Sequence, residues 1–405
     1  MSVFISLHEI SLSSCIIHDP AKRAPPPTTL VFLRFSVSGI EKQKDTGIVM
    51  GCLQNKTGDF QMKSYETILR DDIRDGVIHG AAVLAGYPDR DFCDRGFGFA
   101  ENTLTYPMNT DTVIDIASVT KAAATTTALL VCHSRGLIDF DAPFTDYLTD
   151  YQPELAVPVR IRDLANHTSG FGDVPGETQR RYFNESGSRM LRNMLTMPPP
   201  FPPTQDAKYA CWNYILLAMI IERITGKTFP DFCRDEIFQP LGMHDTALGK
   251  PVDLPPERIA QTLVTEKPGQ ISDFVAFRIY RDGGSTGNAG LFSTAKDLAK
   301  LMRCYLGHGT HGNGRLFTED TFREIKPDRA KKTDGYRRFG WIIYDSLMSD
   351  SEFGTSLLHS GWSGQTVFMN FAKEMFAIVL TTRCGDYDRA KADRFETIRQ
   401  LFEQA

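Results

Sequence analysis

The sequence predicts an α/β fold of the α+β type, with an antiparallel β-sheet flanked by helices and an inserted, mainly helical subdomain. Short apolar runs typical of strands occur between residues 80 and 116 and again between residues 339 and 382. The stretch from 137 to 280 is rich in helix and loop patterns. Strands at both ends of the chain, with helices between them, indicate one sheet that the two ends build together.

The domain organisation follows from a change of pattern near residue 60. Residues 1–60 differ from the regular pattern that follows and contain three consecutive prolines, so we predict an N-terminal extension that is disordered in part. Residues 61–405 are predicted to form one domain. Its sheet is expected from about 61–116 and 280–405, and its helical region from about 117–279.

Each element is predicted from a local pattern. Helices are expected where apolar residues recur at helical spacing, and strands where a short apolar run is bounded by turn residues. Glycines mark the expected ends of two helices. In order, the expected elements are a helix at 64–75, strands at 80–87, 96–100 and 113–116, a helix after Ser118 that stops near Gly136, a helical turn at 161–166, a proline-rich loop at 197–203, a helix at 213–224 that ends at Gly226, strands at 339–344, 366–370 and 375–382, and a closing helix at 388–403.

Composition excludes several classes of partner. A net charge of −5 without charge blocks argues against nucleic acid, whose binding needs a basic surface. No apolar run approaches the roughly 18 residues of a transmembrane helix, and the first residues do not form a convincing signal peptide. The eight cysteines are scattered without Cys-x-x-Cys pairs, which favours reduced thiols and a cytoplasmic location. The histidines are also dispersed, so we expect neither a metal nor another cofactor. The sequence predicts no oligomeric state.

The most informative motif is Ser-x-x-Lys at Ser118–Lys121, which an apolar run of Ala, Thr and Leu residues follows. A serine three residues before a lysine lies on the same helix face, about one turn away. A lysine in an apolar helix costs free energy unless something uses it, and one use is to take the proton of the serine hydroxyl. Alone, the motif is at least as well explained by an N-cap serine beside a chance lysine.

Two other serines compete for the role of nucleophile. Ser293 also begins a Ser-x-x-Lys motif, but Thr294 to Asp297 fits a capping box, which makes Lys296 a solvated residue of the first helical turn. The run Gly283–Gly287 matches Gly-x-Ser-x-Gly, yet a nucleophile elbow needs a strand before it and a helix after it. This run lies in a flexible glycine loop instead.

Segments farther along the chain favour Ser118. The run Lys208–Tyr214 opens an apolar helix, and the run Leu358–Gly364 precedes a strand. With Ser118–Lys121, they resemble the serine β-lactamase and penicillin-binding-protein superfamily, most of all the class C β-lactamase-related branch, which includes D,D-peptidases and esterases. The resemblance covers about residue 62 to the C-terminus and implies a β-lactamase/transpeptidase-like fold. Further segments that carry it are His167–Gly170, Pro240–Met243 and Ala289–Thr294.

The resemblance implies roles for four residues. Ser118 would be the acylated nucleophile, and Lys121 would help to deprotonate it, for which the pKa of Lys121 would need to fall. Tyr209, at the tyrosine of the family's Tyr-x-Asn motif, would share in proton transfer. His359, at the first residue of the family's Lys-Thr-Gly or His-Thr-Gly motif, would lie on an edge strand facing the serine.

The resemblance also implies residues that hold the substrate. The backbone N–H groups of Ser118 and Trp362 would bind the oxyanion. Ser360, Gly361 and Cys211 are the further positions expected to contact the substrate. For His167, outside this set, hydrogen bonds that fix a loop are a better explanation than proton donation.

Two departures from the family pattern bear on the substrate. Cys211 replaces the asparagine of Tyr-x-Asn, and a thiol donates and accepts hydrogen bonds poorly. We expect Cys211 to be a small buried filler rather than a second nucleophile. His359 replaces a lysine whose permanent charge suits a substrate carboxylate, whereas histidine is mostly neutral at pH 7. Both changes weaken the case for β-lactam hydrolysis.

The leading prediction is therefore a serine hydrolase that forms an acyl-enzyme on Ser118 and hydrolyses a small ester, amide or peptide. The first alternative is a β-lactamase or a D-alanyl-D-alanine carboxypeptidase. The second is a non-catalytic binding protein that retains the fold, which Cys211 supports and the intact Ser118, Lys121 and Tyr209 oppose.

Overall fold

A computed structural model of the chain describes part of its length. The described residues are 52–54, 60–172, 185–204, 206–262, 265–312, 314–349 and 351–405. The chain divides after Met50, and the unit that begins at Gly51 holds all of them. Most of the predicted extension at 1–60 lies outside the described residues, so the extension and the domain boundary stay predictions. No helix within the described ranges is both long and apolar enough to cross a membrane.

The central element is a seven-stranded sheet in which every pair of neighbours is antiparallel. The first and last thirds of the domain meet between β3 and β14, where Val83 pairs with Val379. The predicted fold class and the sheet built from both ends of the chain are thus confirmed. In spatial order the strands are β10 (Tyr336–Arg338), β11 (Trp341–Tyr344), β12 (Ser356–Ser360), β13 (Gln365–Asn370), β14 (Met375–Arg383), β3 (Ile78–Gly86) and β4 (Asp91–Gly98).

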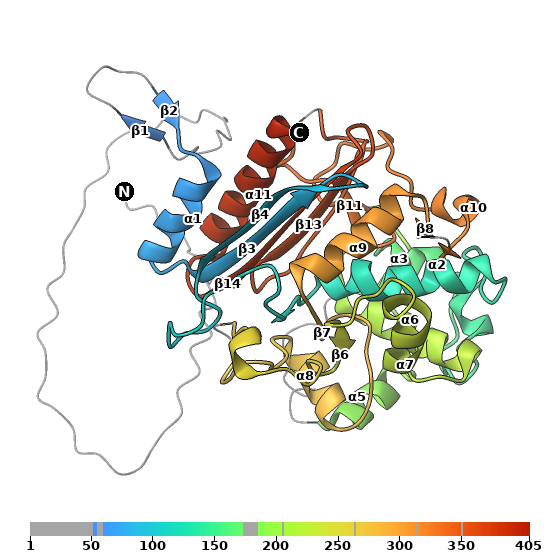
Figure 1. Ribbon diagram of the computed structural model, residues 1–405. Helices are drawn as coiled ribbons and strands as arrows, with labels where there is room; N and C mark the ends of the chain where they lie inside the picture. The colour runs from blue at the N-terminus through green and yellow to red at the C-terminus, as the bar shows by residue number, and fades with distance from the viewer. Residues whose placement is uncertain are drawn as a thin grey trace, which may run out of the picture. The chain divides into compact units, whose positions relative to one another are not determined.

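Helices cover both faces of the sheet, which explains why β3 and β14 read as continuous apolar runs. One face packs against α1 (Tyr65–Arg74) and α11 (Tyr387–Gln404), and the other packs against α9 (Ala295–Leu306) (Figure 1). Successive residues of β3 alternate between the two cores: Val83 packs with the α1–α11 layer, and Leu84 packs in the larger core on the other side.

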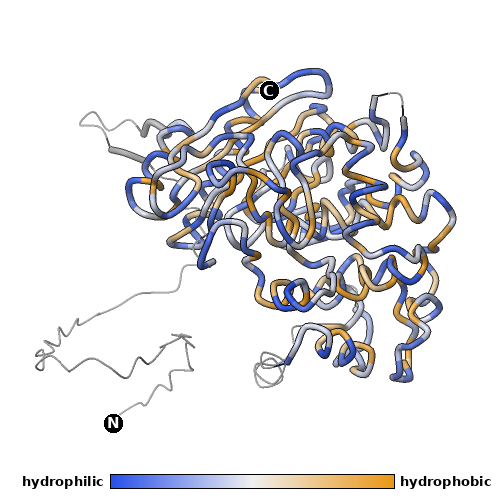
Figure 2. The backbone as a smooth tube through the Cα atoms, turned by 60° about the horizontal axis from the view of Figure 1, so that its bottom comes forward, coloured by the Kyte–Doolittle hydropathy of each residue, from blue (hydrophilic) through white to orange (hydrophobic). Residues whose placement is uncertain are grey.

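The helical region lies between the two halves of the sheet in sequence, as predicted. Blue and orange segments alternate along many of its helices in Figure 2, as expected for helices with one buried face. Its elements are the π-helix η1 (Lys121–Thr126), α2 (Thr127–Ser134), η2 (Phe144–Asp146), α3 (Ile161–Ala165), α5 (Gly187–Met194), α6 (Cys211–Thr225), α7 (Phe229–Cys233), η3 (Arg234–Phe238), η4 (Pro256–Arg258) and α8 (Phe274–Arg281), with α10 (Glu319–Phe322) farther on.

Small sheets complete the architecture. The strands β5 (Ile114–Asp115), β7 (Leu291–Ser293) and β6 (Ala247–Leu248) pair in the order β5-β7-β6. The strand β5 leads directly into Ser118. Two-stranded pairs form between β1 (Cys52–Gln54) and β2 (Phe60–Met62) and between β8 (Thr310–His311) and β9 (Gly314–Arg315).

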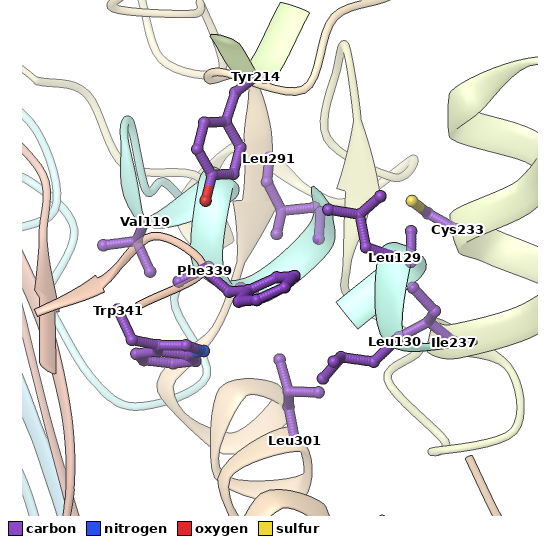
Figure 3. Packing of buried hydrophobic residues seen from close by; sticks show 14 of the residues in the cluster. Val119, Leu129, Leu130, Tyr214, Cys233, Ile237, Leu291, Leu301, Phe339 and Trp341 are labelled. Atoms are coloured by element: carbon purple, nitrogen blue, oxygen red, sulfur yellow. The ribbon is translucent and has the colours of Figure 1, made fainter. Parts of the chain in front are cut away.

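The helix after Ser118 is buried on all sides, as its composition of Ala, Leu and Thr predicts. Side chains of Val119, Leu129 and Leu130 lie with Leu301 of α9 and with Trp341 of β11 in the larger core (Figure 3). The threonines are tolerated because their hydroxyls donate to backbone carbonyls in this core. Their acceptors include Gly287 and Phe339, each 2.7 Å away.

Most predicted elements are present within a few residues of their expected ends, and Gly226 ends α6 in the left-handed conformation. The strand expected at 96–100 is present, but its predicted start is wrong: β4 spans Asp91–Gly98. Its exposed residues include Asp91, Asp94 and Arg95, charges that suit the edge of a sheet and hide the apolar pattern. The strand expected to begin at Phe339 begins at Trp341, because Phe339 has a φ of 46° and lies in a turn.

Candidate active site

Ser118 lies at the end of a strained turn. Ala117, the residue before it, has a φ of 47°, a conformation that costs free energy for any residue with a Cβ. Asp115, which is buried, accepts the N–H of Ala117 at 3.0 Å and the N–H of Ser272 at 2.7 Å. The carboxylate therefore fixes the turn that presents the half-buried Ser118.

Lys121 is fully buried, and its ammonium group faces Ser118. Nζ lies 3.1 Å from Ser118 Oγ, 2.8 Å from the Asn288 carbonyl oxygen and 3.5 Å from Cys211 Sγ. An ammonium has three protons to donate, and these three acceptors match them. The predicted proximity of serine and lysine is present in the structure, and the lysine is held as a charged donor.

The glycine loop after α8 supports Lys121 rather than forming a nucleophile elbow. A helix precedes the loop, and the Ser285 hydroxyl donates to Glu222. The loop approaches η1 so closely that a Cβ on Gly287 would overlap Thr125 Oγ1. This contact places the Asn288 carbonyl against Lys121. No local sequence pattern marks the role of Asn288, because the contact joins residues 167 positions apart.

Tyr209 lies just before α6 and is surrounded by positive charge. Lys121 Nζ is 4.8 Å from the centroid of its ring, and Arg337 Cζ is 4.9 Å from the same centroid. The ring of His167 lies 4.7 Å away, centroid to centroid. Arg337, on β10, was not predicted, since no motif marks it.

Lys121 and Tyr209 both hold their protons near neutral pH. Burial lowers the pKa of Lys121, but Cys211 and Tyr209 outweigh burial, so the pKa is raised overall. Burial also raises the pKa of Tyr209, and this exceeds the opposite effect of Lys121 and Arg337. The condition for Lys121 to act as a neutral base, a lowered pKa, is therefore not met here, because its partners favour the charged form.

His167 fixes a loop by hydrogen bonds, as predicted. Its Nδ1 accepts the N–H of Ala210 at 3.2 Å and lies 3.1 Å from the side-chain nitrogen of Asn213. Because Nδ1 accepts, the neutral ring carries its proton on Nε2. Burial, followed by Arg337 and Lys121, holds the pKa of His167 well below its usual value.

His359 lies on β12, which is an internal strand with β11 and β13 on its two sides, so the predicted edge position is wrong. The pairing with β11 is limited to Leu358, however, and this leaves the His359 end of β12 without a strand partner on that side. Nδ1 lies 3.1 Å from the Ser360 carbonyl oxygen and must carry the proton, since a carbonyl only accepts. Nε2 is then an acceptor, buried and without a hydrogen-bond partner among the described residues.

The charge state of His359 agrees with the sequence expectation. Burial, with Arg337 and Lys121 nearby, holds its pKa well below the usual value. The ring is therefore neutral at pH 7, as expected for a histidine in place of lysine.

Gly361 brings the end of β12 against the turn before Ser118. A Cβ on Gly361 would lie 2.8 Å from the Ile116 carbonyl oxygen and 2.6 Å from Gln365 Oε1. Trp362 follows and is 39% exposed, with Arg383 Cζ 5.2 Å from its ring centroid. Neither the N–H of Ser118 nor that of Trp362 donates a hydrogen bond to another described residue. Both predicted oxyanion donors are thus available.

Cys211 is the first residue of α6 and is half-buried, with its sulfur directed at Lys121. Cys211 is therefore less buried than expected, and its thiol accepts from the lysine. Its expected contact with the substrate stays a prediction. Ser360 is half-buried beside His359.

The side chains of the second Ser-x-x-Lys motif, Ser293 and Lys296, form no hydrogen bond or ion pair with the described residues of this candidate site. Thr294 caps α9 by accepting the N–H of Asp297, and Lys296 pairs with Asp111 at 2.6 Å. Ser293 Oγ lies 2.8 Å from Thr246 Oγ1. The serine and the lysine thus have separate structural partners, as the capping pattern indicated.

The chain belongs to the β-lactamase family, whose model matches residues 65–400, and so to the superfamily of serine β-lactamases and penicillin-binding proteins. A protein of Salmonella agona (strain SL483), provisionally named a D-alanyl-D-alanine carboxypeptidase, is 27% identical over 357 residues, which are 76% of this chain and 82% of that protein. A class C β-lactamase structure from Rhodobacter sphaeroides matches with a TM-score of 0.65 at 19% identity, over 84% of this chain and 99% of that one.

A further structural match is EstCE1, described as a hydrolase with promiscuous acyltransferase activity. Its TM-score is 0.66 at 18% identity, over 82% of this chain and 97% of that one. These two structures share the fold of the described domain.

Proposed function

We propose that the protein is a serine hydrolase that forms an acyl-enzyme on Ser118 and hydrolyses a small ester or amide. The observation that carries the proposal is the 3.1 Å contact between Lys121 Nζ and Ser118 Oγ at a fully buried lysine. A buried cation aimed at a serine hydroxyl stabilises the alkoxide that attack on an acyl carbon requires.

The proposed acylation step balances as follows. Ser118 Oγ forms a bond to the acyl carbon, and its proton passes to the Lys121–Tyr209 pair after the pair has released one proton to solvent. The N–H groups of Ser118 and Trp362 hold the oxyanion, a type of contact worth about 10²–10³ in rate per donor. The bond to the alcohol or amine then breaks, and the pair returns the proton to the leaving group.

Deacylation repeats these steps with water as the nucleophile. The pair takes a proton from the water, the bond to Ser118 Oγ breaks, and the proton returns to Oγ. His359 Nε2, an acceptor without a partner among the described residues, suits a hydrogen-bond donor on the substrate or the attacking water.

An ester is favoured over a β-lactam because of two residues. Cys211 offers no amide to a substrate carbonyl, and His359 is neutral where a lysine would bind a carboxylate. EstCE1, the structural neighbour described as a hydrolase with promiscuous acyltransferase activity, is consistent with this preference.

The test is covalent labelling of the full chain. We expect a fluorophosphonate to form one covalent adduct on Ser118, detected as an increase in mass, and we expect 4-nitrophenyl esters to be hydrolysed. Ser118→Ala should lose both, whereas Ser293→Ala, the matched control from the second Ser-x-x-Lys motif, should keep both. No acylation of the folded protein between pH 6 and pH 10 would reject the proposal and favour a binding protein.

A second candidate is a D-alanyl-D-alanine carboxypeptidase, which the name of the Salmonella relative favours. It predicts a Ser118 adduct with a fluorescent penicillin and release of D-alanine from a peptide that ends in D-alanyl-D-alanine. Ester hydrolysis without either result would leave the esterase as the better description.

A further inference from the structure

Arg337 reaches the site from the edge of the sheet. It lies on β10, opposite Ile342 of β11, and the turn between these strands is anchored to the helical region. The Phe339 carbonyl accepts from Thr126 Oγ1 at 2.7 Å, and the Gly340 N–H donates to the Ala165 carbonyl at 2.9 Å. These anchors hold the Arg337 guanidinium 4.9 Å from the centroid of the Tyr209 ring.

The charge of Arg337 forms no ion pair with another described residue, and the carboxylates of Asp345 and Asp334 act on it from beyond ion-pair distance. Its Nη1 donates to the Gly340 carbonyl at 3.0 Å, and among the described residues no carboxylate lies within ion-pair distance of it. The neighbouring Arg338 differs, since it forms an ion pair with Asp328. Arg337 is half-buried, so solvent screens its charge only in part.

The other titratable groups around Tyr209 do not supply a second fixed charge. Lys121 of η1 is the first cation. His167 and His359 are neutral, because burial and the two cations oppose their protonation. On α6, Cys211 raises the pKa of Tyr209, which is opposite to the effect of the two cations. Tyr214, also on α6, is neutral because burial raises its own pKa.

We propose that Arg337 is a positioning residue for acyl transfer, and that its guanidinium, with no described carboxylate at ion-pair distance and placed over the Tyr209 ring, supplies the second fixed positive charge of the site. His359 is neutral where the family pattern has a charged lysine, and in this chain Arg337, on a different strand, supplies a positive charge instead. The inference rests on the proposed function, in which Tyr209 gives and receives a proton. A cation beside a phenol favours the phenolate, so Arg337 lowers the free energy needed to deprotonate Tyr209.

The first test measures Tyr209 itself and needs no substrate. In the full chain carrying [Cζ-¹³C]tyrosine, the signal that Tyr209→Phe removes is followed by NMR from pH 7 to pH 12. We expect Arg337→Gln to move this titration upward by about one pH unit, with Arg337→Lys close to wild type. Arg338→Gln is the matched control and should leave it unchanged. An unchanged titration in Arg337→Gln would overturn the proposal even if the proposed function fails.

The second test measures acylation of Ser118 by 4-nitrophenyl acetate, an uncharged ester, across the same pH range. We expect Arg337→Gln to reduce the rate about tenfold near neutral pH and to approach the wild-type rate at high pH, with rescue by Arg337→Lys. An equal loss at every pH would mean a merely structural role and overturn the proposal.

In the remaining alternative, Arg337 binds a carboxylate of the substrate. A mono-nitrophenyl ester of succinate, which carries a carboxylate, distinguishes this alternative from the proposal. A KM that rises in Arg337→Gln for this ester alone, with an unshifted profile for the acetate, would identify Arg337 as a carboxylate anchor and overturn the proposal. Equal shifts for both esters would support it. Absence of Ser118 labelling in wild type would reject the proposed function separately, since the Tyr209 titration does not depend on it.

Discussion

The Asp115 carboxylate accepts the N–H of Ala117 at 3.0 Å, and this bond holds Ala117 in a left-handed conformation with a φ of 47°. The second carboxylate oxygen accepts the N–H of Ser272 at 2.7 Å. Asp115 therefore joins the turn before Ser118 to the segment that leads into α8. Two N–H donors converge on one side chain, and only a carboxylate offers both of them an acceptor.

We predict that Asp115→Asn slows acylation of Ser118 by at least about tenfold, because the amide nitrogen would face one of the two N–H groups and displace the turn. Single-turnover acylation with a nitrophenyl ester measures the effect. Asp111→Asn, a change at an exposed ion pair with Lys296, is the control and should retain the wild-type rate. A wild-type rate in Asp115→Asn would show that Ser118 does not depend on this bond.

The same residue predicts a dependence of stability on pH. Burial raises the pKa of Asp115 to about 6 in the folded protein, above the value of about 3.9 for an unfolded chain. The folded state therefore favours the protonated form, and the stability present below about pH 4 is lost as the pH rises through about 6. Relative to Asp115→Asn, the wild type should lose up to about 3 kcal/mol of unfolding free energy over this range. Urea unfolding at a series of pH values checks this, and a constant difference would contradict it.

Gly361→Ala should reduce acylation strongly while leaving the protein folded. The new Cβ would lie 2.8 Å from the Ile116 carbonyl and 2.6 Å from Gln365 Oε1, so β12 must move away from the turn that carries Ser118. Gly172→Ala is the matched control, because the nearest atom to its Cβ would be 3.8 Å away. Rates and circular dichroism should be compared for both variants. Normal activity in Gly361→Ala would mean that β12 need not touch this turn.

The sequence allowed prediction of the parts of the site that local patterns mark. Ser118 and Lys121 are three residues apart, so the helix alone brings them together. Asn288 and Arg337 were missed because their contacts with Lys121 and Tyr209 join distant parts of the chain, and neither lies in a motif. The direction in which the pKa of Lys121 shifts could not be read from the sequence for the same reason, since it depends on partners that only the fold brings together.

The sheet was predicted more completely than the strand positions within it. Apolar runs at both ends of the chain indicate β3 and β14, which are buried on both faces. No apolar run marks the whole of the charged strand β4, and no local pattern shows that β12 is an internal strand. The exposure of a strand and the strands beside it depend on how the whole chain packs.

For the wild type, the acylation rate should rise with pH from neutral into the alkaline range. Cys211 and Tyr209 outweigh burial and raise the pKa of Lys121, and burial raises that of Tyr209, so the pair lacks a free base near pH 7. Each pH unit should increase the rate about tenfold until the pair has lost one proton. Burial holds the pKa of His359 well below its usual value, so no inflection from this group is expected near pH 6.5. A bell-shaped profile centred on pH 7 would contradict this assignment.

Cys211→Ala should shift this profile in the opposite direction from Arg337→Gln. The Cys211 sulfur accepts from Lys121 Nζ at 3.5 Å and raises the pKa of the lysine. Without the thiol, the lowering of the Lys121 pKa by burial is opposed less, so the lysine loses its proton at a lower pH. Acylation near pH 7 should therefore increase. The measurement is the same pH series, with Cys384→Ala as the control, since that thiol lies outside the site and contacts the Gly76 carbonyl. An alkaline shift in Cys211→Ala would mean that the thiol assists deprotonation of Lys121, and the assignment of Cys211 as an acceptor for the ammonium would then be wrong.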